Sequence, residues 1–210
     1  RYFCSAFQNH SSMPSPQVVS AQEALAHVRS NDHIFIHSVA AAPQHLIDAL
    51  VERHDTLKNV HLYHLHTEGV ARYVEPQYRG IFELHSFFVG ANVRKATWEG
   101  RADYIPVFLS EIPDIIRRQA VPINVALISV SPPDKNGYVS LGTSVDATLA
   151  AVQTAKLVIA QVNRCMPRTF GDATVHCSEI DFLVEKDEPL HEVHSEALTE
   201  QEERIGLYIA

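Results

Sequence analysis

Three stretches of the chain combine small, hydroxyl-bearing and glycine residues in a way that could bind a small ligand. They are residues 38–44, 90–94 and 131–146, and each lies between an expected strand and an expected helix. At such a junction the first N–H groups of the helix have no partner inside it and can bind a ligand. Loops of this kind occur in every α/β protein, so the pattern alone favours an ordinary connection over a ligand site.

The chain has 13 histidines, and three of them, His61, His64 and His66, lie on one expected strand. Side chains alternate between the two faces of a strand, so His64 and His66 share a face while His61 points the other way. A zinc site needs several ligands that converge on one ion. The spacing therefore predicts scattered or internally satisfied histidines and no metal site.

Cysteine and arginine offer two further possibilities. Cys165 and Cys177 have no histidine placed beside them by a recognisable pattern, which favours inert thiols over nucleophiles. Arg168 precedes Gly171 and Asp172, and its guanidinium is suited to binding a carboxylate or a phosphate. An ion pair between Arg168 and Asp172 explains the pattern equally well.

Composition limits the class of protein. The 210 residues are 46% hydrophobic and 20% charged, which is typical of one folded, water-soluble domain. A formal net charge of −8 gives no basic field for nucleic acid or an anionic membrane, and no apolar run approaches the length of a membrane span. Three scattered cysteines fit a reducing, cytoplasmic location. Residues 1–16 are interpreted as a tag or flexible arm.

The three loops require strands and helices around them, and the hydrophobic pattern supplies both. Strands and helices alternate, which predicts an α/β fold with an open, mostly parallel sheet and helices on both faces. Residues 190–210 end inside an expected helix, which indicates a fragment of a longer chain. Strands are expected at residues 33–37, 60–66, 82–89, 104–108, 125–130, 157–162 and 182–185, and helices at residues 20–29, 43–51, 92–99, 110–118 and 145–155.

Four longer blocks carry a resemblance to a known family. They read SFFVGANVRK at residues 86–95, GRADYIPVFLSEIP at 100–113, SVSPPD at 129–134 continuing to GYVSLGTSVDA at 137–147, and VNRCMPRTFGD at 162–172. The chain from residue 17 to its end resembles the N-terminal domain of acetyl-CoA hydrolases and transferases, which are class I CoA-transferases. The fourth block, together with His176 and Ser178, resembles the 4-hydroxybutyrate CoA-transferase branch.

The resemblance implies transfer of coenzyme A between a short-chain acyl-CoA and a carboxylate such as acetate. A glutamate forms an acyl anhydride and then a glutamyl-CoA thioester, and the resemblance places it in a C-terminal half that follows residues 17–210.

The nucleophilic glutamate is therefore expected beyond Ala210, and no catalytic residue is assigned within the chain. Glu111 lies in the first turn of an expected helix, where its carboxylate would interact with the helix N-terminus. No acidic or basic residue lies at a spacing from Glu83, Glu99 or Glu179 that would indicate catalysis. The fragment alone is expected to be inactive.

The resemblance also implies the substrates, the partners and the residues that line the cleft. Coenzyme A is a substrate, no cofactor is covalently bound, and the partners are acyl-CoA, small carboxylates, the C-terminal half and further copies in a homo-oligomer. An acyl-CoA hydrolase and a non-catalytic α/β binding module remain alternatives. The expected substrate-binding residues are Ala40, Ala41, Ala42, Pro43, Gly90, Asn92, Arg94, Gly142, Thr143, Ser144, Asp146, Arg168 and His176.

Overall fold

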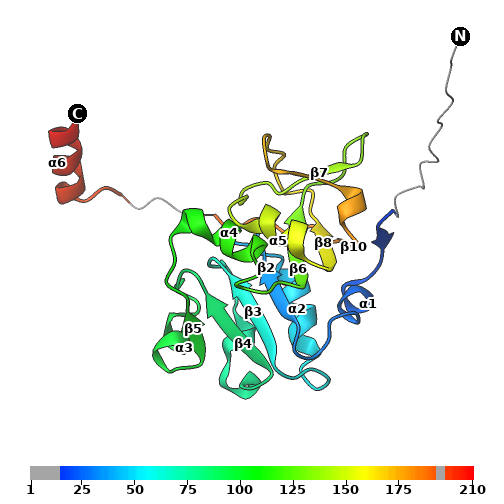
Figure 1. The fold of residues 1–210 in the computed structure, drawn as a ribbon. Coiled ribbons are helices and arrows are strands. Elements are labelled where there is room, and N and C mark those ends of the chain that lie inside the picture. The colour runs from blue at the N-terminus through cyan, green and yellow to red at the C-terminus, as the bar shows by residue number, and fades with distance from the viewer. Residues whose placement is uncertain (1–14, 193–196) are drawn as a thin grey trace, which may run out of the picture.

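A central sheet of eight strands organises the molecule, and every neighbouring pair in it is parallel (Figure 1). The computed structural model describes residues 15–192 and 197–210. In the order in which they lie side by side, the strands are β1 (Gln17–Val18), β10 (Phe182–Glu185), β8 (Leu157–Val162), β6 (Val125–Val130), β2 (His33–Ile36), β3 (Val60–His64), β4 (Phe82–Ser86) and β5 (Ala102–Tyr104).

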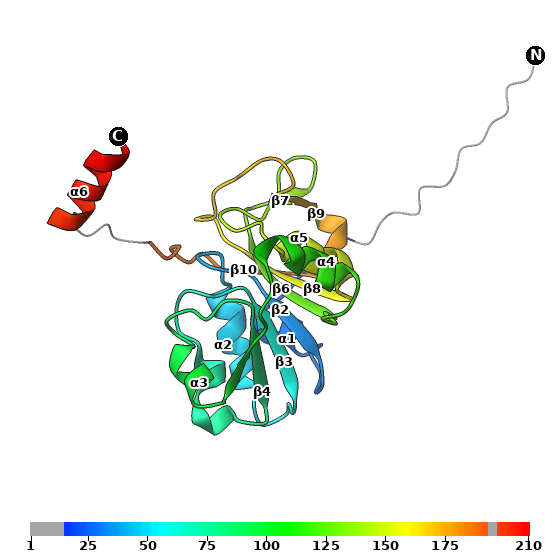
Figure 2. The same ribbon diagram turned by 60° about the vertical axis from the view of Figure 1, so that its left-hand side comes forward.

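Helices cover both faces of this sheet, as Figure 2 shows, which confirms the predicted fold class. On one face, Ile34 and Ile36 of β2 pack in a core with α1 (Ala21–Leu25), α2 (Gln44–Glu52) and α3 (Arg94–Trp98). On the other face, Phe35 packs with α4 (Ile112–Arg117) and α5 (Thr148–Thr154). Strands buried on both faces read as continuous apolar runs, and all six residues of β6 are buried.

Local sequence signals account for several helix starts. Ser20 caps α1 in the predicted capping box, where its Oγ accepts from Glu23 N and the Glu23 carboxylate accepts from Ser20 N. Thr199 and Glu202 form the same box at α6 (Glu200–Ile209), a helix in which no residue is buried. Four 3-10 helices complete the helical elements of the described residues: Arg72–Val74, Pro76–Tyr78, Leu109–Glu111 and Cys177–Glu179.

A helix was expected within residues 190–210, and α6 is that helix. Its last residue is Ile209, and Ala210 follows as the C-cap, with its N–H donating to Gly206 O at 3.1 Å.

The structure also differs from the predicted elements elsewhere. The helix expected at residues 20–29 ends at Leu25, and the strand expected at residues 82–89 ends at Ser86. The strand expected at residues 104–108 is β5, which runs only from Ala102 to Tyr104, so residues 105–108 were assigned wrongly. A second, antiparallel sheet pairs β7 (Tyr138–Ser140) with β9 (Thr174–His176), and neither was predicted. Each is three residues long and pairs with a segment distant in sequence, so no local pattern marks it. The two-residue β1 was missed for the same reason.

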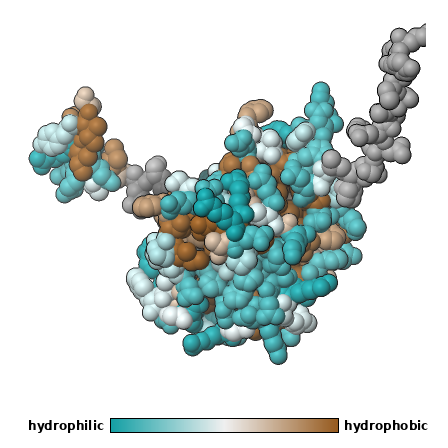
Figure 3. Space-filling model, in the orientation of Figure 1, coloured by the Kyte–Doolittle hydropathy of each residue, from teal (hydrophilic) through white to brown (hydrophobic). Residues whose placement is uncertain are grey.

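The surface is mixed in character. Figure 3 shows apolar residues gathered near the segment that leads from β5 to α4, where Tyr104, Phe108 and Leu109 are exposed. Patches of this kind are typical of surfaces that contact another protein. In the part of the chain that the structure describes, no helix has the length and apolarity to cross a bilayer. Of the expected arm at residues 1–16, residues 1–14 lie outside the described residues.

Candidate functional site

The three predicted loops lie at one edge of the sheet, because parallel strands present their carboxyl ends together. Residues 38–44 follow β2, residues 90–94 follow β4 and residues 131–146 follow β6. The loop after β3 joins the first two. Val39 N donates to His66 O at 2.8 Å, and Asn92 Nδ2 donates to Thr67 O at 2.9 Å and to Gly69 O at 3.2 Å.

His37 joins the first loop to the third. It is fully buried at the end of β2, where its Nδ1 accepts from Ser129 N at 3.2 Å. Its Nε2 therefore carries the hydrogen and donates to Ser144 O at 2.5 Å. Burial lowers the pKa of His37, which favours this neutral form. His37 was not among the predicted residues, although its position directly after an apolar strand was a usable signal.

The backbone of the first loop is strained at Val39. This residue has φ +55°, in the left-handed region that β-branched side chains rarely adopt. A bridge to Thr67 holds the conformation. Strained backbone costs about 1–3 kcal/mol and is concentrated at functional sites. The strained Val39 lies at the carboxyl edge of the sheet, and this position supports a binding role for residues 38–44.

A cleft of about 230 Å³ opens at this edge, beside the ends of β2, β6 and β8. The predicted residues Ala40 and Ala42 line it, whereas Ala41 and Pro43 do not. The binding role expected for these small residues stays a prediction. The remaining lining residues are Gln44, Ser129, Gln161, Asn163, Glu188, Pro189, Leu190 and His191.

Polar atoms without a partner lie in and beside the cleft. Gln161 is 1% exposed, yet its Oε1 has no hydrogen-bond donor among the described residues, and the same is true of Gln44 Oε1 and of Ser38 Oγ. The orientation of both amides is settled, because Gln161 Nε2 donates to Glu188 Oε2 at 2.7 Å and Gln44 Nε2 donates to Asp48 Oδ1 at 3.2 Å. Two buried acceptors without donors are costly unless a ligand with N–H or O–H groups satisfies them.

A carboxylate of the chain itself occupies part of the cleft. Glu188 Oε2 accepts from Gln161 Nε2 and, at 3.4 Å, from His45 N in the first turn of α2. The start of a helix favours negative charge, because its N–H groups and its dipole both point toward the anion. The cleft therefore accommodates a carboxylate. Glu188 was not singled out in the sequence, because it lies far along the chain from α2.

The predicted residues of the third loop are largely held by the protein. Gly142 has φ +67°, and a Cβ there would lie 2.0 Å from Met166 Sδ, so this position requires glycine. Asp146 Oδ1 accepts from Thr148 N at 3.2 Å and from Thr148 Oγ1 at 3.1 Å, which ties Asp146 to the first residue of α5. Thr143 is exposed.

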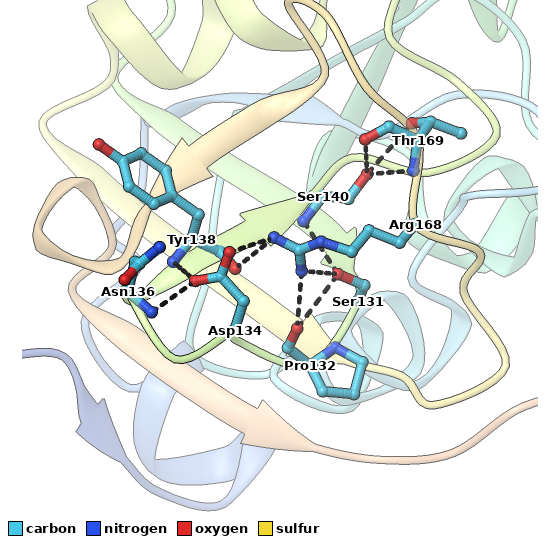
Figure 4. A network of polar contacts seen from close by, with 8 residues as sticks. All are labelled: Ser131, Pro132, Asp134, Asn136, Tyr138, Ser140, Arg168 and Thr169. Atoms are coloured by element: carbon cyan, nitrogen blue, oxygen red, sulfur yellow. Dashed lines mark hydrogen bonds and ion pairs between the residues drawn. The ribbon is translucent and has the colours of Figure 1, made fainter.

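Arg168 is also bound within the protein (Figure 4). Its Nη2 lies 2.8 Å from Asp134 Oδ2 and donates to Tyr138 O at 3.1 Å. The ion pair therefore forms with Asp134 rather than with Asp172, the partner considered from sequence. Hydrogen bonds from the backbone N–H groups of Tyr138 and Asn136, together with Arg168, lower the pKa of Asp134. Arg168 thus stabilises the turn between β6 and β7.

His176 and Arg94, the remaining predicted residues, do not line the cleft. His176 Nδ1 faces Ser178, 3.2 Å from its N and 2.7 Å from its Oγ, and the ring lies edge-on to Tyr138. Arg94 is exposed at the start of α3. Gly90 is half-buried, and a Cβ there would meet Asn92 Oδ1 at 3.0 Å.

Comparison with known proteins places the chain in a family. The family described as "Acetyl-CoA hydrolase/transferase N-terminal domain" matches residues 8–193. The chain therefore belongs to the acetyl-CoA hydrolase/transferase family, which is the family its sequence blocks resemble.

Curated relatives of the chain are CoA-transferases. A succinyl-CoA:acetate/propanoyl-CoA:succinate CoA transferase of Fasciola hepatica is 44% identical over 91% of this chain and 40% of its own length. A 4-hydroxybutyrate coenzyme A transferase of Clostridium kluyveri is 38% identical over 90% of this chain and 44% of its own length. The chain thus spans less than half the length of these relatives.

Solved structures agree on the fold. RipA from Yersinia pestis superposes with a TM-score of 0.83 at 27% identity and covers 88% of this chain and 45% of that one. A 4-hydroxybutyrate CoA-transferase from Porphyromonas gingivalis superposes with a TM-score of 0.71 at 29% identity and covers 84% of this chain and 41% of that one.

Proposed function

We propose that this chain forms one wall of a CoA-transferase active site and binds acyl-CoA in the cleft at the carboxyl edge of its sheet. The observation that carries the proposal is the pair of unpartnered buried acceptors, Gln44 Oε1 and Gln161 Oε1. The pantetheine arm of coenzyme A contains two amides, whose N–H groups are the donors that these atoms lack. The acyl-CoA is 4-hydroxybutyryl-CoA, butyryl-CoA or acetyl-CoA, and the acceptor is a carboxylate such as acetate.

The proposed reaction passes through a glutamate beyond Ala210, outside the present chain. Its carboxylate attacks the thioester carbonyl and expels the CoA thiolate, which leaves an acyl-glutamyl anhydride. The thiolate attacks the glutamyl carbonyl, releases the acyl carboxylate and forms the glutamyl-CoA thioester. The incoming carboxylate then repeats the two steps in reverse and leaves with the CoA.

In this scheme the present chain orients the substrates. Gln44 and Gln161 hold the pantetheine arm, and the small residues Ala40 and Ala42 let it approach the backbone. The start of α2, where Glu188 now lies, provides the site for a substrate carboxylate. His37 holds the first and third loops together through its hydrogen bonds to Ser144 O and Ser129 N.

Two observations support placing the nucleophile beyond Ala210. The relatives are more than twice as long as the stretch matched here. The glutamates weighed from sequence have local roles instead: Glu99 pairs with Arg101, Glu179 caps a 3-10 helix and Glu111 stands at the start of α4. Glu83 lies in a histidine cluster on β4.

The test compares this chain with the same chain joined to the C-terminal half of a relative or of its own gene. Each protein is incubated with butyryl-CoA and acetate, and the acetyl-CoA formed is measured by chromatography. We expect no transfer by the 210-residue chain and restored transfer by the longer protein. Turnover by the short chain alone would overturn the assignment of the glutamate. Release of free CoA without acetyl-CoA would indicate a hydrolase.

A further inference from the structure

A cluster of titratable side chains lies on the sheet away from the cleft. His33, His61 and His85 come from the adjacent strands β2, β3 and β4, and the ring centroids of neighbouring pairs lie 4.5 and 5.2 Å apart. Glu83 of β4 and Asp103 of β5 border them. His61 and Glu83 are the second residues of β3 and β4, His85 is the fourth residue of β4, and none of them lines the cleft.

Three of these side chains converge on one point. His61 Nδ1 lies 3.0 Å from His85 Nε2 and 3.7 Å from Glu83 Oε2, and all three ligand atoms lie within 4.8 Å of one another. Two atoms bound to Zn²⁺ at about 2.0–2.1 Å in a tetrahedral site lie about 3.3 Å apart. The two measured distances bracket this value. Two of the three spacings therefore suit a tetrahedral ion, and the third is within 4.8 Å.

The surroundings of His85 provide a second, independent indication. Its Nε2 faces His61, while its Nδ1 lies 3.4 Å from Asp103 Oδ2. Histidines that bind a metal almost always direct the other ring nitrogen to a carboxylate or carbonyl, which fixes the ring orientation and makes the ligand more basic. Asp103 stands in that position because it pairs with His85 across β4 and β5, and its side chain is 76% exposed.

We propose that His61, Glu83 and His85 bind a divalent transition metal, with Zn²⁺ as the best fit, and that Asp103 supports His85. Two imidazoles and one carboxylate suit zinc rather than Ca²⁺ or Mg²⁺, which prefer oxygen ligands. His33 is not a fourth ligand, because its ring stacks on His61 and its Nδ1 lies 3.1 Å from Tyr63 Oη. Water fills the fourth position, since the side chain of Glu83 is 46% exposed.

The sequence could not show this site, because its ligands come from two strands. His61 was weighed only with His64 and His66 of its own strand. His64 contacts Tyr73 instead, which agrees with the expected alternation of faces. The strand pairing places His61 beside Glu83, and Tyr63 beside His85, so residues from β3 and β4 meet on one face. A bound ion would link these two strands directly.

Calorimetric titration of the 210-residue chain with Zn²⁺ alone tests the proposal. We expect one ion per chain. His61→Gln and His85→Gln should each weaken binding by more than the about 10–100-fold that loss of a supporting residue causes, and Asp103→Asn should weaken it by about 10–100-fold. His27→Gln is the matched control, because His27 is an exposed histidine stacked on Phe182, and it should bind Zn²⁺ like the unaltered chain.

Two readouts keep the test independent of folding. Asp103→Asn changes an exposed side chain, so the fold is retained, and circular dichroism checks this for every variant. Co²⁺ bound in place of Zn²⁺ should give the intense visible absorption of a tetrahedral site in the unaltered chain and in His27→Gln. Absence of stoichiometric binding to the unaltered chain, or equal binding by His61→Gln and His85→Gln, would overturn the proposal.

Discussion

Two fully buried histidines, His37 and His64, hold the loops at the carboxyl edge of the sheet. His37 links β2 to the backbone of Ser129 and Ser144. His64 Nε2 lies 3.1 Å from Tyr73 Oη, which in turn lies 3.2 Å from Thr67 Oγ1. Burial lowers the pKa of His64 to about 4 and raises the pKa of Tyr73 to about 12. Both side chains are therefore neutral near pH 7.

This burial predicts acid sensitivity. The folded-state pKa of His64 is below its ordinary value near 6.5, so the unfolded chain binds the proton first as the pH falls. Stability is then lost between about pH 6.5 and pH 4, by about 3 kcal/mol for this residue. Urea unfolding at a series of pH values measures the slope. His64→Gln should flatten it, while His27→Gln should leave it unchanged; equal slopes for His64→Gln and the unaltered chain would contradict the account.

At the scale of elements, the third loop depends on one close approach. Gly142 and Gly100 have nearly the same φ, +67° and +68°, but a Cβ at Gly142 would meet Met166 Sδ at 2.0 Å, whereas a Cβ at Gly100 would meet nothing within 4 Å. Alanine at either position costs about 1–2 kcal/mol for the left-handed backbone. Gly142→Ala should cost at least about 1 kcal/mol more, since overpacking adds to it.

Thermal unfolding of the two variants measures this difference directly. Because the backbone conformations match, the difference between Gly142→Ala and Gly100→Ala isolates the contact with the loop at residues 166–169. Equal losses of stability would show that the two loops do not pack as described.

The elements that the sequence predicted well are those with a strong local signal. β6 was predicted with the bounds it has because it is a continuous apolar run, and the start of α1 was predicted because Ser20 and Glu23 form a capping box. β7 and β9 pair across more than thirty residues, and no pattern within either segment reveals the partner. For the same reason the ion-pair alternative considered from sequence joined Arg168 to Asp172, its neighbour in the chain, and not to Asp134.

The candidate site shows the same limit. Ala40 and Ala42 could be predicted as cleft residues because small residues before a helix are visible in the sequence. Gln161 and Glu188 could not, because they become site residues only when β8 and the segment after β10 line the same cleft as the loop after β2. The prediction of a homo-oligomer stays a prediction, and the exposed apolar residues Tyr104, Phe108 and Leu109 are where an interface would be sought.

At the scale of the whole molecule, the proposed function has one central claim: the Gln161 amide, whose Oε1 has no donor among the described residues, binds the acyl-CoA. The variant Gln161→Leu removes that amide, and Gln22→Leu, on the exposed face of α1, is the control. Both are made in the protein that includes the C-terminal half, where turnover can be followed.

The deciding measurement is the KM for butyryl-CoA in these two variants. One lost hydrogen bond between neutral groups is worth about 0.5–1.5 kcal/mol, so Gln161→Leu should raise KM about 3- to 10-fold and leave kcat nearly unchanged. Gln22→Leu should match the unaltered enzyme. An unchanged KM for butyryl-CoA in Gln161→Leu would show that the acyl-CoA does not bind in this cleft.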